Sequence, residues 1–166
     1  MTKLVAIDPG PTESAYVRLG YDGSVLAFGK RPNEEVAGII ERARNRSGHL
    51  AIEMIASYGM PVGREVFETC VWIGRYIERW SLAHTLVYRR EVKLHLCGSP
   101  KAKDGNVRQA LIDRWGGRER AIGKKRTPGQ LYGFNSDVWQ ALGVAVTWWD
   151  ANVSDGETLG ASVEAA

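Results

Sequence analysis

Three acidic residues stand where short apolar segments of the chain end or begin. Asp8 follows the run Leu4-Val-Ala-Ile, Glu53 follows Leu50-Ala-Ile, and Asp137 opens a long apolar stretch. Short apolar runs indicate buried strands, so the first two acids are expected at strand ends. Each acid alone has an ordinary structural use, as a turn cap, a salt-bridge partner or a first-turn helix acid. Their order is the stronger signal, because two adjacent strand ends and a helix packed over them can converge on one point.

Converging carboxylates can do chemistry once a cation joins them. They repel one another by roughly several kcal/mol in a low dielectric, and a divalent ion removes that repulsion. Hard oxygen ligands suit Mg²⁺ or Mn²⁺ rather than Zn²⁺. Two such ions ~4 Å apart stabilise both the attacking water and the leaving oxygen in phosphodiester cleavage. The three acids therefore predict a site for two Mg²⁺ ions, for which Mn²⁺ can substitute.

The elements that must position these acids follow from apolar periodicity and turn residues. Strands are predicted over residues 4–8, 14–20 and 24–29, and Asp22-Gly23 is a strong hairpin signal, so these three form an antiparallel meander. A strand at 49–55, a helix at 64–80 and a strand at 84–88 predict a parallel βαβ unit. Further helices are predicted at residues 34–46, 104–115 and 136–149, the last with Ser136 as its N-cap; residues 91–96 are ambiguous, and the Gly-rich, basic stretch 116–135 is a predicted loop.

Composition indicates a globular chain with one folded domain. The 166 residues are 44% hydrophobic, with a net charge of +3 and a pI near 8.9, which alone is weak support for nucleic-acid binding. We expect a domain over residues 1–150 and a disordered tail over 151–166, where few side chains can be buried. No signal peptide is evident, and no apolar run approaches the roughly 20 residues of a membrane span, so a cytoplasmic location is expected. Cys70 and Cys97 are then expected to be free thiols.

Four stretches together resemble one family. Residues 6–10 (Ala-Ile-Asp-Pro-Gly), 51–53 (Ala-Ile-Glu) and 136–147, in that order, resemble the RuvC family of Holliday junction resolvases. Residues 91–107 are similar to the same family, and more so to its phage-type branch, which would place the protein in a host cytoplasm. The resemblance runs from about residue 3 to residue 149. It implies an α/β, RNase H-like fold with a mixed five-stranded sheet flanked by helices, a homodimer, and Mg²⁺-dependent endonuclease action on four-way DNA junctions.

The resemblance also assigns metal ligands, with one departure. The first two acids of the family fall on Asp8 and Glu53, and the first ligand of its final helix falls on Asp137. The second ligand of that helix falls on Gln140, whose neutral amide binds metal less tightly than a carboxylate. Residues three apart share a helix face, so Gln140 can still coordinate. Either the site works with fewer charges, or Asp104 supplies one, or this position has been altered; Asp104 can equally be the N-cap of the helix that follows it.

Basic and aromatic residues indicate where DNA would lie. Mobile cations in the loop before the last helix suit phosphate binding, and the resemblance implies that basic residues around Lys93 and Lys101 to Lys103 face the junction. An aromatic residue wedges into the crossover in the family; the aligned position is Ala56, and we expect nearby Tyr58 to stack on bases instead, unless it packs against the long helix. The predicted DNA contacts are Tyr58, Lys93, Lys101, Lys103, Lys124, Lys125 and Arg126.

The helix from Arg64 to Trp80 is apolar on more than one face, which indicates either a buried helix or a subunit contact. Cutting both equivalent strands of a four-way junction needs two active sites in fixed register, which a two-fold dimer provides. We expect Phe67, Val71 and Gly74 nearest the dimer axis. Two other functions stay open: an RNase H-like nuclease on hybrid or other branched nucleic acids, and a junction-binding protein with weak activity because of Gln140.

Overall fold

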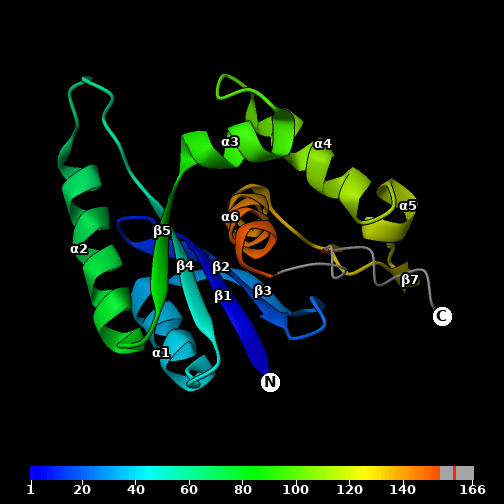
Figure 1. Cartoon of the computed structure of the whole chain (residues 1–166), viewed down its shortest axis with the longest axis horizontal. Helices are drawn as coiled ribbons and strands as arrows, with labels where there is room; N and C mark the ends of the chain where they lie inside the picture. The colour runs from blue at the N-terminus through cyan, green and yellow to red at the C-terminus, as the bar shows by residue number, and fades with distance from the viewer. Residues whose placement is uncertain (154–158, 160–166) are drawn as a thin grey trace.

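A mixed five-stranded sheet lies at the centre of the molecule, in the order β3-β2-β1-β4-β5 (Figure 1). The computed structural model describes residues 1–153 and residue 159. The first three strands pair antiparallel, β4 pairs parallel with β1, and β5 pairs parallel with β4. The strands are β1 (Thr2–Asp8), β2 (Glu13–Gly20), β3 (Val25–Pro32), β4 (His49–Met54) and β5 (His84–Tyr88). The predicted meander, βαβ unit and mixed sheet are confirmed.

Helices cover both faces of the sheet. Helices α1 (Asn33–Ala43) and α2 (Arg64–Trp80) lie on one face, and α6 (Ser136–Asn152) lies on the other. Helices α3 (Arg89–Cys97) and α4 (Asp104–Arg114) pack on the outer side of α6 (Figure 1). Because α6 is enclosed between the sheet and these two helices, it is apolar around nearly its whole circumference. Gly143 permits this close packing, since a Cβ there would lie 2.9 Å from Val92 Cγ1.

Side-chain alternation along the strands divides the interior into two cores. Val5 and Ile7 of β1 join the core under α1 and α2, whereas Leu4 and Ala6 join the core around α6. In a strand, residues two apart share a face, so Asp8 lies on the α6 face with Leu4 and Ala6. The same alternation in β4 places Glu53 on the α6 face, since Ala51 belongs to that core. Both strand-end acids therefore face the helix that begins with the third acid.

Three local features differ from the sequence predictions. The ambiguous residues 91–96 are helical, within α3. The predicted loop 116–135 contains a short helix, α5 (Arg118–Ala121), and a two-stranded ribbon of β6 (Gly123–Lys124) and β7 (Thr127–Pro128). The N-cap of α6 is Asn135, whose Oδ1 accepts a hydrogen bond from the Val138 amide at 3.1 Å, and Ser136 is the first helical residue. The Asn135 side chain reaches the Val138 amide because Asn135 stands three residues before Val138.

The end of the chain is described only in part. Residues 154–158 and 160–166 of the predicted tail lie outside the described residues. Helix α6 continues to Asn152, and Leu159 is buried beside Trp149 and Gly23. The Leu159 carbonyl oxygen accepts a hydrogen bond from Arg114 Nε at 2.9 Å. None of the helices in residues 1–153 has the length and apolar character that a membrane span requires.

Candidate metal centre and nucleic-acid interface

The ends of β1 and β4 hold Asp8 and Glu53 side by side. The two strands are parallel neighbours, and their last pair is Ile7 opposite Ile52. Asp8 and Glu53 are the next residue on each strand, and both face α6. Asp137 stands in the first turn of α6, and it lines the same cavity of about 220 Å³ as Asp8. The fold thus places Asp8 between Glu53, on the neighbouring strand, and Asp137, at the start of α6.

The charges of the three acids act on one another. Burial, and then the negative charges of Glu53 and Asp137, raises the pKa of Asp8 to about 8. The positive charges of Arg89 and Lys30 oppose this shift. Burial also raises the pKa of Glu53, with Arg89 again acting in the opposite direction. Asp8 is therefore the partly buried centre of an acidic site that has a cation on either side.

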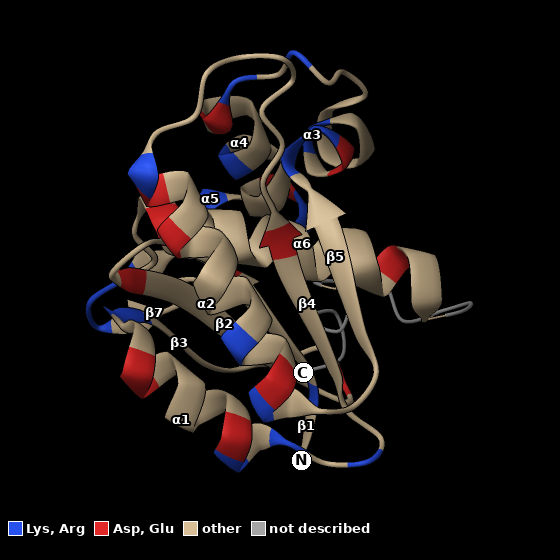
Figure 2. Cartoon of the chain, turned by 90° about the vertical axis from the view of Figure 1, so that its left-hand side faces the viewer, with Lys and Arg blue, Asp and Glu red and all other residues tan. Residues whose placement is uncertain are grey.

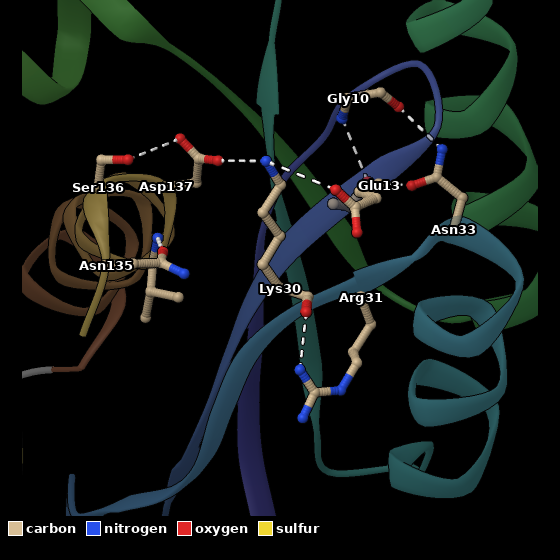
Figure 3. A network of polar contacts seen from close by, with 10 residues as sticks. Gly10, Glu13, Lys30, Arg31, Asn33, Asn135, Ser136 and Asp137 are labelled. Atoms are coloured by element: carbon tan, nitrogen blue, oxygen red, sulfur yellow. Dashed lines mark hydrogen bonds and ion pairs between the residues drawn. The ribbon is translucent and has the colours of Figure 1, made fainter. Parts of the chain in front are cut away.

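A buried hydrogen-bond network holds the turn that follows Asp8. Asn33 Nδ2 donates to the Gly10 carbonyl at 2.9 Å, and Ser14 Oγ donates to Asn33 Oδ1 at 2.7 Å (Figure 3). Ser14 Oγ also accepts from the Gly10 amide at 3.2 Å, and the Tyr76 hydroxyl from α2 lies 2.9 Å from both Ser14 Oγ and Asn33 Oδ1. Only glycine fits at residue 10, because a Cβ would lie 2.3 Å from the Glu13 carbonyl oxygen. The network ties the Asp8 turn to α1 and α2.

Arg89 is a site residue that the sequence analysis missed. At the junction of β5 and α3, its Nη1 lies 3.6 Å from Glu53 Oε2, and its Nη2 donates to Asp104 Oδ1 at 2.7 Å. Lys93 Nζ lies 3.5 Å from the same Asp104 oxygen. The alternative that Asp104 is the N-cap of α4 is wrong: the N-cap is Lys103, and Asp104 is the first helical residue, whose side chain contacts these cations. Its negative charge contributes to the raised pKa of Glu53, which places it beside the site.

Lys30 is the second residue that the sequence analysis missed. Its Nζ lies 2.8 Å from Asp137 Oδ2 and 3.9 Å from Glu13 Oε2 (Figure 3). The strand register explains this position: Asp8 pairs with Ala15 on β2, and Ala15 pairs with Lys30 on β3. The three residues form one row across the sheet, and the small Ala15 side chain leaves room between the two ends. The hairpin signals set this register, and counting along the hairpins could have found Lys30.

Gln140 lies one helical turn beyond Asp137. It is partly buried, and its Oε1 is shielded from solvent without a hydrogen-bond partner. With Asp104, Arg108 and Trp139 it lines a neighbouring cavity of about 320 Å³. A shielded amide oxygen without a donor is able to accept a cation.

The donor set fits a hard divalent cation. In residues 1–153, no three acidic, His or Cys side chains are arranged as a ready metal cage, and Lys30 and Arg89 pair with the flanking acids Asp137 and Glu53. The available ligands are nevertheless all oxygens, and Glu53 Oε2 and Gln140 Oε1 are shielded atoms that accept no hydrogen bond. Burial and the negative charges of Glu53 and Asp137 raise the pKa of Asp8, and a bound cation would favour its charged form.

A cationic groove adjoins the Glu53 side of the site. Tyr58 is 63% exposed, in a left-handed conformation with φ of 49°, so most of its side chain faces solvent. It lines a cavity of about 420 Å³ whose other lining residues are Arg89, Arg90, Lys93, Pro100 and Lys101. In Figure 2 the basic residues of α3 lie above the ends of β4 and β5. The predicted contacts Tyr58, Lys93 and Lys101 thus come together, with Arg89 joining them to Glu53.

The remaining predicted DNA contacts lie elsewhere. Lys103 is exposed just before α4. Lys124, Lys125 and Arg126 are exposed on the β6–β7 ribbon, at the end of the molecule away from α2 (Figure 1). Lys124 and Arg118 line a cavity of about 490 Å³ there. The structure therefore has two separate basic regions, of which only the groove adjoins the acids.

Comparison with known proteins supports the fold. No protein-family profile and no curated protein sequence matches the chain. Among solved structures, Thermus thermophilus RuvC is similar with a TM-score of 0.60 and 18% identity, over 91% of this chain and 96% of that one. T. thermophilus RuvC in complex with a Holliday junction substrate gives a TM-score of 0.63 and 14% identity over the same shares. At these identities the likeness establishes the fold, which is the RNase H-like fold of RuvC.

Proposed function

We propose that this protein is a divalent-metal-dependent endonuclease that cuts four-way DNA junctions. The observation that carries the proposal is the meeting of Asp8, Glu53 and Asp137 beside a cationic groove, on the fold of a junction resolvase. The similarity of residues 91–107 favours the phage-type branch of these enzymes.

The acids would hold Mg²⁺ or Mn²⁺, with Gln140 and Asp104 as the further candidate ligands. When bound, the ion would polarise the scissile phosphate and the attacking water. The protein contributes the position of the acids: the Asn33 network fixes the Asp8 turn, and Arg89 fixes Glu53. Hydrolysis would leave a 5′-phosphate and a 3′-hydroxyl.

The groove would position the DNA. Lys93, Lys101 and Arg90 are the phosphate contacts in the groove, and Lys103 is a contact just before α4. Lys124, Lys125 and Arg126 are a second contact along a junction arm. Tyr58 would stack on a base that is unpaired at the crossover. Such binding weakens steeply as the salt concentration rises, because each phosphate contact releases counterions.

The active unit is proposed to be a two-fold dimer through α2. Phe67 and Val71 are 63% and 55% exposed on one stripe of this helix, and a Cβ at Gly74 would meet no atom within 4 Å. Val71→Glu should convert the dimer to a monomer in light scattering, whereas Leu94→Glu, which alters an equally exposed residue on α3, should leave the dimer intact. A wild-type monomer at micromolar concentration would contradict this assembly.

A cleavage assay on a synthetic four-way junction tests the function. The protein, in Mg²⁺ or Mn²⁺, should nick two opposing strands symmetrically and leave an unbranched duplex of the same sequence intact. An RNA–DNA hybrid run in parallel distinguishes the RNase H alternative, for which the hybrid is cut and the junction is not. Junction binding without nicking in either metal would support a binding protein, the alternative that the neutral Gln140 favours.

A further inference from the structure

A lysine occupies the part of the acidic site that faces β3. Lys30 and Asp8 line the same cavity as Asp137, and Lys30 Nζ lies 2.8 Å from Asp137 Oδ2. Figure 3 shows the lysine side chain crossing from β3 to the start of α6, with its ammonium between Asp137 and Glu13. The strand register places Lys30 here, since Ala15 of β2 pairs with Lys30 of β3 on one side and with Asp8 of β1 on the other.

The balance of charge limits how many divalent ions the site can hold. Asp8, Glu53 and Asp137, together with Glu13 and Asp104 beside them, supply five negative charges. Lys30, Arg89 and Lys93 supply three positive charges in return. One divalent ion would bring this group close to neutrality, whereas two would leave a large positive excess in a partly buried place. Such an excess is costly in a low dielectric, and Gln140 supplies no charge to offset it.

We propose that Lys30 is a resident cation of this site, which takes the position of a second metal ion at Asp137. The chain then holds one divalent ion, with Asp8 and Glu53 as its main ligands, and Lys30 neutralises Asp137. This inference rests on the proposed function, in which these acids bind a divalent cation. Lys30 suits the role because its ammonium is a compact charge with three donors on a flexible stem, and β3 keeps it close to Asp137.

Counting bound Mn²⁺ tests the inference without any cleavage assay. Titration of the DNA-free full-length chain, followed by calorimetry and by the electron paramagnetic resonance of free Mn²⁺, should give one ion per chain for the wild type. Lys30→Met should give two ions, because Asp137 is released, and Lys30→Arg should keep one. Arg46→Met, which removes an exposed cation from the connection between α1 and β4, should also keep one.

The outcomes separate this inference from the proposed function. Two ions in the wild type, or one or none in a folded Lys30→Met, would overturn the role of Lys30 while the metal site itself survives. No Mn²⁺ binding by the wild type would instead overturn the proposed metal chemistry, and the inference with it. If Lys30→Met does not fold, as judged by circular dichroism, the same titration of Asp137→Asn tests the inference. Asp137→Asn should retain one ion with an affinity within about threefold of the wild type, and loss of the ion would overturn the inference.

Discussion

Two cations flank the partly buried Asp8, and their surroundings differ. Arg89 comes from the β5–α3 junction, its side chain is 21% exposed, and two acids, Glu53 and Asp104, hold it. Lys30 comes from β3, its side chain is 37% exposed, and it contacts Asp137, with Glu13 at the limit of an ion pair. The Arg89–Glu53 pair is largely enclosed by the fold, whereas the Lys30–Asp137 pair lies at the rim of a cavity.

This difference indicates which side of the site is fixed and which side can adjust. A guanidinium has several donors in a rigid plane, so the two acids lock Arg89 in one orientation. Arg89 Nη1 and Glu53 Oε2 are both shielded from water, and removing either would leave a buried charge without its partner. The ammonium of Lys30 is on a flexible stem near solvent, so it can shift among acids at little cost. We therefore expect substitutions on the Arg89 side to damage the site more than those on the Lys30 side.

Removal of the central carboxylate should have the largest effect. Asp8→Asn keeps the shape of the side chain but removes the charge that a divalent ion needs, so junction cleavage should fall by at least about 10³-fold. Junction affinity, measured by gel shift in Ca²⁺ or without divalent ions, should stay within roughly tenfold, because the proposed phosphate contacts lie in the groove and not at Asp8. Asp113→Asn, an exposed acid on α4, is the matched control. Retained cutting by Asp8→Asn would exclude Asp8 as a ligand.

Arg89→Ala should have the next largest effect. It leaves Glu53 partly buried without its cation, so the free energy of unfolding should fall by about 1–3 kcal/mol in urea denaturation. Cleavage should fall by up to about 10²-fold, since a small displacement of a ligand is costly to the reaction. Arg90→Ala changes the exposed neighbour in the same groove and should alter stability by less than about 0.5 kcal/mol. Equal effects of the two variants would show that the Arg89 side is no more fixed than the surface.

The sequence predicted the fold better than it predicted these two cations. Strand ends and apolar periodicity are local signals, and they located β1, β4 and α6 and the acids that those elements carry. Lys30 and Arg89 were missed because their roles depend on strand register and on the path from β5 into α3. A lysine or arginine near a strand end resembles any solvated charge in the sequence. Leu159 was missed for a related reason, since it packs against Gly23, which is distant in the chain.

The raised pKa of Asp8 predicts a pH dependence of stability in the absence of metal. The folded chain keeps a proton on Asp8 up to a pKa of about 8, whereas the unfolded chain releases it near the ordinary value of 3.8. The folded state thus binds more protons between these values, and this contribution to stability is lost as the pH rises through that window. In EDTA, Asp8→Asn should match the wild type near pH 4 and exceed it by about 1–3 kcal/mol at pH 8.

Urea denaturation at both pH values measures this gap, and Mg²⁺ should narrow it by stabilising only the wild type. A gap that does not change between pH 4 and pH 8 would show that burial and the neighbouring acids do not raise the pKa of Asp8. Asp113→Asn again provides the control, with no gap expected at either pH.

The smallest effect is expected on the Lys30 side, from Gln140→Asp. The new carboxylate lies one turn from Asp137, where Lys30 can shift toward it and neutralise part of its charge, so cleavage should stay equal or rise by no more than about tenfold. In the Lys30→Met background no lysine can move toward the new carboxylate. Gln140→Asp should therefore raise the Mn²⁺ affinity of the Asp137 side by a larger factor than it does in the wild type. Gln109→Asp on the exposed side of α4 should do neither. A loss of cleavage in Gln140→Asp would mean that the amide has its own role, and equal gains in both backgrounds would mean that Lys30 does not adjust to the charge around it.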